Sequence, residues 1–154
     1  MKLLLFGLGL AACSAPRAAS PGEVVFVCEH GAAKSVVASQ YFNKLAGERG
    51  LAVRAIARAA EPQAELSVSA VNGLNQDGLP PDPGPPRPLT ASDVRRSARV
   101  IAFDCAQPAM TALRRMDACW DDVPATGDDY AGARDRIRAH VEAMVDQLVA
   151  QSKS

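Results

Sequence analysis

Residues 24–35, with the sequence VVFVCEHGAAKS, constrain the fold more than any other part of this 154-residue chain. An apolar run rich in β-branched residues predicts a strand that is buried on both faces, as in a parallel sheet. The strand ends at Cys28, and a loop of mostly small residues leads to a helix that begins near Ser35. A strand, a short loop and a helix form one unit of a fold in which strands alternate with helices.

The same alternation continues along the chain. Four strands are predicted, at residues 23–27, 51–60 and 99–104 and around 119–120. Helices are predicted at residues 35–50, 67–78, 90–98 and 107–116, followed by a last helix that runs to about residue 148. The predicted fold class is therefore α/β: a three-layer sandwich with an about four-stranded parallel sheet and helices on both faces.

The last helix carries the clearest apolar stripe, since its apolar residues recur at helical spacing: Ile137, Val141, Met144, Val145 and Leu148. Thr126 and Asp129 resemble a capping box at its start. Residues 78–88 contain six prolines and predict an exposed, stiff loop.

The first residues are typical of an export signal. A lysine is followed by eight apolar residues, too few to span a bilayer, and residues 10–13 read LAAC, like a bacterial lipobox. We expect a signal peptide at 1–12, lipidation of Cys13, a tether at 13–22 and one domain at 23–151. The expected location is the periplasmic side of the bacterial cell envelope, with the outer membrane favoured. A plain secretory signal and a chance apolar start are the alternatives.

Charge and aromatic content argue against nucleic acid as a partner. The chain has 17 basic and 17 acidic residues, and 5% of its residues are aromatic. It therefore offers neither a basic stripe nor a surface for base stacking. Because no CxxC pair or histidine pair is present, no metal site is predicted, and no cofactor is expected.

The loop after Cys28 has the composition of an anion-binding loop. Its alanines and glycine allow backbone N–H groups to converge on one point, and the following helix begins there. A helix N-terminus also favours the thiolate, which is the nucleophilic form of a cysteine. We therefore predict that Cys28 faces a site for a tetrahedral oxyanion.

Residues 24–46 resemble the start of the low-molecular-weight protein tyrosine phosphatases, a family that includes thioredoxin-coupled arsenate reductases. That family has a strand, a cysteine, five loop residues, an arginine, a serine or threonine, and then a helix. The resemblance extends over residues 23–148, including the strand at 99–104 and the Trp-Asp segment before the last helix. It implies the fold of this family and a thiol-based phosphatase that works through a phosphocysteine intermediate.

The resemblance also implies a role for individual residues. Cys28 would be the nucleophile, and the hydroxyl of Ser35 would bond to its sulfur. A downstream aspartate would protonate the leaving group, and Asp121 or Asp122 is the nearest match, although neither directly precedes the proline as the family's aspartate does. The oxyanion would bind to the backbone of the loop residues Glu29, His30, Gly31, Ala32 and Ala33.

Lys34 stands where the family has arginine. A lysine keeps the positive charge but loses the two-pronged contact with an oxyanion. Glu29 adds a carboxylate that repels a phosphate dianion and raises the thiol pKa unless His30 or Lys34 offsets it. We therefore expect weak phosphatase activity, and we expect Lys34→Arg to raise it.

Cys105 and Cys119 are the redox candidates. The arsenate reductases of the family relay a disulfide from the nucleophile through two further cysteines, and Cys105 ends the strand at 99–104. The export signal and the position of Cys105 at a neighbouring strand end predict a disulfide between Cys28 and Cys105, provided that their strands are adjacent; a bond between Cys105 and Cys119 that leaves Cys28 free is the alternative.

The sequence is consistent with three functions. The first is a phosphatase-like enzyme that acts on phosphotyrosine or a small aryl phosphate. The second is an arsenate reductase or another thiol redox protein, which would need a thiol reductant as its partner. The third is a non-catalytic module that binds an oxyanion or a partner. All three involve a membrane anchor through the lipid on Cys13.

Overall fold

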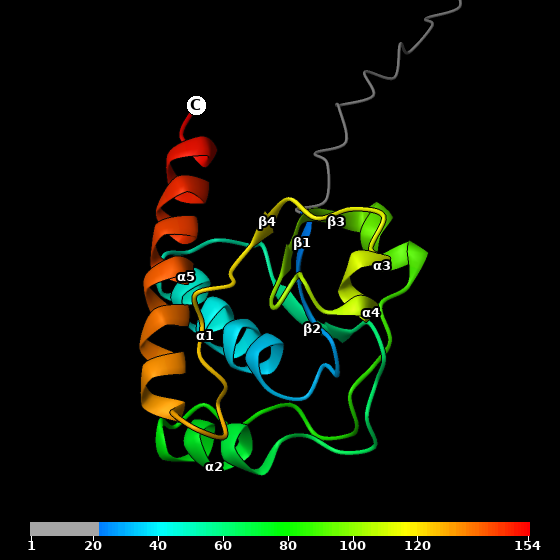
Figure 1. The fold of residues 1–154 in the computed structure, drawn as a ribbon. Coiled ribbons are helices and arrows are strands. Elements are labelled where there is room, and N and C mark those ends of the chain that lie inside the picture. Colours follow the sequence, from blue (N-terminus) through cyan, green and yellow to red (C-terminus); the bar gives the residue numbers. More distant parts are fainter. Residues whose placement is uncertain (1–21) are drawn as a thin grey trace, which may run out of the picture.

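The computed structural model describes residues 22–154, which form one sheet flanked by helices (Figure 1). The predicted signal peptide, Cys13 and nearly all of the tether lie outside the described residues. Within this range, no helix is both long enough and apolar enough to cross a membrane. In chain order the elements are β1 (Glu23–Cys28), α1 (Lys34–Glu48), β2 (Ala55–Ala59), α2 (Val68–Gln76), α3 (Ala91–Arg96), β3 (Ser97–Ala102), α4 (Pro108–Thr111), β4 (Ala118–Cys119) and α5 (Tyr130–Ser152).

The four strands are parallel and lie in the order β2-β1-β3-β4, which confirms the predicted α/β class. β1 is an inner strand, and residues 24–27 have no exposed surface. Its register pairs Cys28 with Ala59 of β2 and Val27 with Ala102 of β3. Because parallel strands end at one edge of the sheet, the loops after β1, β2 and β3 meet there. This edge is where such folds bind ligands.

The side chains of β1 alternate between two apolar cores, one on each face of the sheet. Phe26 and Cys28 belong to the core beneath α1, α2 and α5, whereas Val25 and Val27 belong to the core beneath α4. Phe26 is in an aromatic cluster, and its ring centroid lies 5.4 Å from that of Trp120. Successive residues of β1 therefore face opposite layers, which fixes the face on which the Cys28 thiol lies.

The predicted apolar stripe of the last helix is confirmed. Leu148 is half-buried, and the other four stripe residues are buried: Ile137, Val141, Met144 and Val145. The predicted capping box is wrong. Asp129 alone caps α5, and its carboxylate accepts a hydrogen bond of 2.8 Å from the Gly132 N–H. Thr126 instead accepts a hydrogen bond from Ser69, because the segment before α5 folds back over the start of α2.

The outer edge of the sheet is closed by a side chain and by the proline-rich loop. The Asn43 amide donates to the Ala55 carbonyl and accepts from the Ala55 N–H, so β2 begins at Ala55 and not at the predicted residue 51. At the other end of β2, the backbone of Ala59 bonds to Arg87 and Leu89. These contacts cover a strand edge that would otherwise pair with another chain.

The region after β3 also differs from the prediction, because α4 spans only Pro108–Thr111 where a helix over residues 107–116 was expected. Arg115 lies outside the helix and donates hydrogen bonds to the carbonyls of Ser97 and Ala98. These bonds tie the chain back to β3 before it enters β4.

A hydrogen-bond network around Asp77 joins α2 to α1 and α5. The hydroxyls of Tyr41 and Tyr130 donate to one carboxylate oxygen at 2.8 and 2.7 Å, and Arg134 reaches the other at 3.4 Å. Burial opposes ionisation of this carboxyl, but the hydrogen bonds prevail and lower its pKa. Burial and the bond to Asp77 raise the pKa of Tyr41 to about 12. Gly73 lies within α2, and because it has no side chain the Tyr130 ring can pack against the helix at this position.

Candidate active site

Cys28 ends β1 with 7% of its surface exposed. Its Sγ lies 3.1 Å from the Oγ of Ser35, in the first turn of α1. Either the hydroxyl or the thiol can be the donor of this hydrogen bond. Among the cysteines of residues 22–154, Cys28 is the free one. The predicted pairing of Cys28 with a hydroxyl is therefore present in the structure.

Carbonyl groups of the loop between β1 and α1 are held by the segments that surround it. The Cys28 carbonyl at the end of β1 and four loop carbonyls accept hydrogen bonds, four of the five bonds coming from the chain that follows β2 and one from α1. The donor N–H and acceptor carbonyl pairs are Ala60 to Cys28, Glu61 to Glu29, Gln63 to His30, Ser67 to Ala32 and Val37 to Ala33. In a trans peptide the carbonyl and the next N–H point in opposite directions, so the N–H groups of this loop turn away from those segments.

The N–H groups of residues 29–36 have no hydrogen-bond acceptor within residues 22–154. No side chain caps the start of α1, and its first turn contains no acidic residue. Unpaired N–H groups at the start of a long helix carry partial positive charge and bind anions. The loop therefore presents unpaired N–H groups next to Cys28, which is the arrangement expected of a backbone site for an oxyanion.

Gly31 gives the loop its shape. Its φ angle is +63°, a left-handed conformation that residues with a side chain rarely adopt. A Cβ at this position would lie 2.6 Å from the Cβ of Ala59 and 3.0 Å from its backbone nitrogen. Since Ala59 is bonded on both sides in the sheet, it cannot easily move aside. Glycine thus satisfies both the turn and the close approach to β2.

Glu29 and His30 lie at the exposed rim of the loop. The His30 Nδ1 is 3.2 Å from the Glu61 carbonyl, and its Nε2 is 3.6 Å from the Glu29 carboxylate. The imidazole is therefore occupied by its neighbours at the surface. These contacts place both side chains at the outside of the loop, while the backbone supplies its centre.

Lys34 is buried, with 8% of its surface exposed, and its ammonium is already paired. Its Nζ donates to the two carboxylate oxygens of Asp104 at 2.8 and 2.9 Å and to the Val123 carbonyl at 2.7 Å. We expected the ammonium to hold the oxyanion in place of the family's arginine. In this structure Lys34 instead joins α1 to the chain that follows β3 and to the chain that follows β4.

Within the described part of the chain, neither Asp121 nor Asp122, the two candidates for the general acid, is hydrogen-bonded to the loop between β1 and α1. Asp122 Oδ1 lies 2.7 Å from His140 Nε2, and this hydrogen bond lowers the pKa of Asp122. Asp121 accepts the Cys105 N–H at 2.9 Å. A general acid needs a pKa near the working pH, so a lowered pKa suits Asp122 poorly for that role. The residue directly before the proline is Val123, which is 3% exposed.

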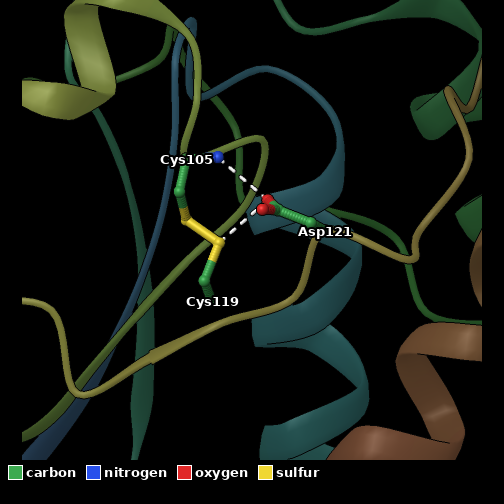
Figure 2. A group of neighbouring side chains, drawn as sticks. All are labelled: Cys105, Cys119 and Asp121. Atoms are coloured by element: carbon green, nitrogen blue, oxygen red, sulfur yellow. Dashed lines mark hydrogen bonds between the residues drawn. A yellow bond between two sulfur atoms is a disulfide. The ribbon is translucent and has the colours of Figure 1, made fainter.

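The predicted disulfide between Cys28 and Cys105 is wrong, because Cys105 is bonded to Cys119 (Figure 2). β1 and β3 are adjacent, as the prediction required, but the two side chains face different layers. Cys28 belongs to the core beneath α1, whereas Cys105 packs against the core beneath α4. Neighbouring strand ends therefore do not bring these two sulfurs together.

Asp121 lies beside the disulfide, with its Oδ1 2.8 Å from the Cys119 Sγ (Figure 2). The ligand atoms of Cys105, Cys119 and Asp121 all lie within 4.8 Å of one another. A metal binds thiolates, however, and a sulfur in a disulfide is not a thiolate. In the oxidised state this cluster offers a metal ion only a carboxylate.

The disulfide is expected to contribute about 3 kcal/mol to the free energy of unfolding, because it closes a loop between residues 14 positions apart. Urea unfolding of the oxidised and reduced proteins measures the difference. The Cys28→Ser variant is the matched control and should show the same difference, since Cys28 is outside the bond. Equal urea midpoints for the oxidised and reduced proteins would contradict the expected contribution.

Sequence reasoning did not assign roles to Asp104 and Val123. Lys34 and Asp104 are 70 positions apart in the chain, and only the adjacency of β1 and β3 brings them together. The bond to Val123 uses a backbone carbonyl, which carries no side-chain signal. The position of Asp104 two residues after β3 is the one signal that could have placed it at this edge of the sheet.

In comparisons with known proteins, this chain is similar to solved structures, but it matches no family model and has no significant match to a curated protein sequence. A thioredoxin-dependent arsenate reductase of Corynebacterium glutamicum matches with a TM-score of 0.67 and 19% identity, over 88% of this chain and 65% of the reductase chain. This chain thus spans slightly less than two thirds of that reductase.

Two phosphatases match over nearly their whole length. A low-molecular-weight phosphotyrosine phosphatase of Vibrio cholerae has a TM-score of 0.69 and 16% identity, over 84% of this chain and 98% of its own. A low-molecular-weight protein tyrosine phosphatase of Streptococcus pyogenes has a TM-score of 0.68 and 13% identity, over 82% and 93%. The chain therefore has the fold of the low-molecular-weight protein tyrosine phosphatases, which thioredoxin-dependent arsenate reductases share.

Proposed function

We propose that the chain is a thiol-based phosphatase-like enzyme that acts on phosphotyrosine or a small aryl phosphate. The main support is the free thiol of Cys28, which is bonded to Ser35 and adjoins a run of unpaired N–H groups. This combination supports a nucleophilic role for Cys28 and a site in the loop for the three non-bridging oxygens of a phosphoryl group. The phosphatases with the same fold support the reaction class.

The reaction has two displacements. The Cys28 thiolate attacks phosphorus, an S–P bond forms, and the bond from phosphorus to the aryl oxygen breaks. The aryl oxide leaves and takes a proton from water. A water molecule then attacks the phosphocysteine, which releases inorganic phosphate, returns the electron pair to sulfur and gives one proton to solvent. The N–H groups of the loop stabilise the charge that develops on the phosphoryl oxygens.

The surroundings of the loop limit this activity. The ammonium of Lys34 is bonded to Asp104, and the hydrogen bond from His140 lowers the pKa of Asp122, which moves it further from the pKa that a general acid needs. The leaving aryl oxide therefore receives little help from a general acid. We infer slow turnover that favours substrates with acidic leaving groups.

The rate is expected to depend steeply on the leaving group. Phenyl phosphate should react roughly 100-fold more slowly than 4-nitrophenyl phosphate, because a general acid that would level the two rates contributes about 10²–10⁴-fold in enzymes that have one. Initial rates for a series of substituted phenyl phosphates measure this dependence. The matched variant is Asp122→Asn, which should follow the same dependence as the wild type. If the wild type hydrolysed all substrates of the series at equal rates and Asp122→Asn did not, Asp122 would be a working general acid, and this part of the proposal would be overturned.

Arsenate reduction is the second candidate, because arsenate is also a tetrahedral oxyanion and a disulfide lies at the end of the neighbouring strand. Reduction of arsenate to arsenite takes two electrons, which a dithiol partner would supply. The placement of Cys28 and Cys105 in different cores argues against a direct relay between them. Arsenite formation that depends on Cys28 and Cys105 would favour this candidate.

A non-catalytic module that binds an oxyanion or a partner is the third candidate, and it would stand if no reaction depended on Cys28. The lipid anchor at Cys13 and the location in the cell envelope stay predictions of the sequence. The disulfide between Cys105 and Cys119 supports export, since such bonds persist mainly in oxidising compartments.

A further inference from the structure

The oxyanion loop is the loop between β1 and α1, residues 29–33. The hydrogen bonds of Lys34 determine whether its ammonium can bind an anion in this loop. An ammonium group has three N–H donors. The three acceptors within reach are both oxygens of Asp104 and the carbonyl of Val123, at 2.7–2.9 Å. While Asp104 keeps this position, Lys34 has no donor left for an anion in the loop.

The exposure of the two side chains shows which of them can leave the pair at lower cost. The Asp104 side chain is 38% exposed, so water can replace the lysine as its partner. The Lys34 side chain is 10% exposed, so its ammonium needs another acceptor within the protein or a ligand. An oxyanion bound in the adjacent loop would provide that acceptor.

Asp104 lies in the turn at residues 103–107, and several contacts hold the conformation of this turn. Its φ angle is +52°, in the left-handed region where aspartate and asparagine are the commonest residues after glycine. Its carbonyl accepts the Gln107 N–H at 3.0 Å, and the next residue, Cys105, donates its N–H to Asp121. The disulfide then joins Cys105 covalently to Cys119 at the end of β4 (Figure 2).

We propose that Asp104 is a positioning residue that keeps Lys34 off the oxyanion loop, and that the Cys105–Cys119 disulfide holds Asp104 in that role. A dithiol reduces the disulfide: the S–S bond breaks, two electrons and two protons pass to the two sulfurs, and the dithiol becomes a disulfide. The turn at residues 103–107 then relaxes, Asp104 moves into solvent, and Lys34 turns to the bound oxyanion. The inference rests on the proposed function, because it requires an oxyanion in the loop.

Titration with inorganic phosphate tests the redox part, with the N–H signals of residues 29–36 followed by NMR in the full chain. Reduction with dithiothreitol is expected to tighten phosphate binding roughly tenfold, the effect of one charge-assisted hydrogen bond. Lys34→Met should bind phosphate equally in both redox states. Equal affinities for the oxidised and reduced wild type would overturn the redox coupling.

The positioning role is tested with the disulfide intact. Asp104→Asn removes the charge and keeps a residue that accepts a positive φ. The oxidised variant is expected to bind phosphate roughly tenfold more tightly than the oxidised wild type, and salt should weaken the gain because it is electrostatic. The double variant Asp104→Asn, Lys34→Met should lose the gain. If the oxidised Asp104→Asn protein binds phosphate no better than the wild type, Asp104 does not position Lys34.

These results separate the inference from the function on which it rests. A wild-type protein that binds phosphate in neither redox state contradicts both, because the loop then takes no oxyanion. Turnover that depends on Cys28 but does not change with the disulfide or with Asp104 leaves the proposed function in place and overturns the inference alone.

Discussion

Replacing Cys28 with serine is expected to reduce steady-state hydrolysis of 4-nitrophenyl phosphate by about a thousandfold or more, to the background rate. The serine hydroxyl is a far weaker nucleophile than a thiolate at neutral pH, and no other thiol in residues 22–154 is free. Steady-state rates of the purified wild type and variant measure the loss.

Serine and cysteine differ little in size, and the position is a strand end whose backbone pairs with β2. The thermal unfolding midpoint of Cys28→Ser should therefore stay close to that of the wild type. A variant that is folded and as active as the wild type would remove Cys28 from the reaction. It would then favour the module that binds without catalysis.

Replacing Gly31 with alanine is expected to lower both turnover and phosphate binding by roughly 100-fold, the scale of losing one oxyanion contact or more. The new Cβ would lie 2.6 Å from that of Ala59, and the positive φ angle adds a cost of about 1–2 kcal/mol. The loop must shift to relieve both, and its N–H groups then lose their common focus. Phosphate titration and initial rates measure the effect.

Two other glycines provide matched controls for this variant. Gly50 also has a positive φ, +69°, but a Cβ there meets no atom within 4 Å, so Gly50→Ala should cost stability without changing turnover. Gly47 lies inside α1 in open space, and Gly47→Ala should raise stability by about 0.5–1 kcal/mol. If Gly31→Ala behaves like Gly50→Ala, the shape of the loop does not depend on close packing against Ala59.

Much of the fold could be predicted because its signals are local. The apolar run before Cys28 predicted β1, and the spacing of Ile137 and Val141 predicted the buried face of α5. Predictions failed where distant segments decide the outcome. The Asn43 side chain sets the start of β2, and Thr126 bonds to α2 in place of the start of α5.

The candidate site also has a part that could be predicted from local sequence and a part that depends on distant segments. The contact between Cys28 and Ser35, which the family resemblance implied, lies within one short stretch of the chain and is present in the structure. The partner of Lys34 depends on the order of the strands, which places the end of β3 beside that of β1. The disulfide depends on which face of the sheet each sulfur occupies, and strand adjacency does not determine that face.

The proposal that Cys28 attacks phosphorus is tested most directly by a search for the intermediate. The protein is mixed with excess 4-nitrophenyl phosphate, denatured within milliseconds and examined by phosphorus NMR and by mass spectrometry of its peptides. We expect one phosphoryl group on the sulfur of Cys28, formed with the first burst of 4-nitrophenol. Release of phosphate with no phosphoryl group on Cys28, or with one on another residue, would contradict it.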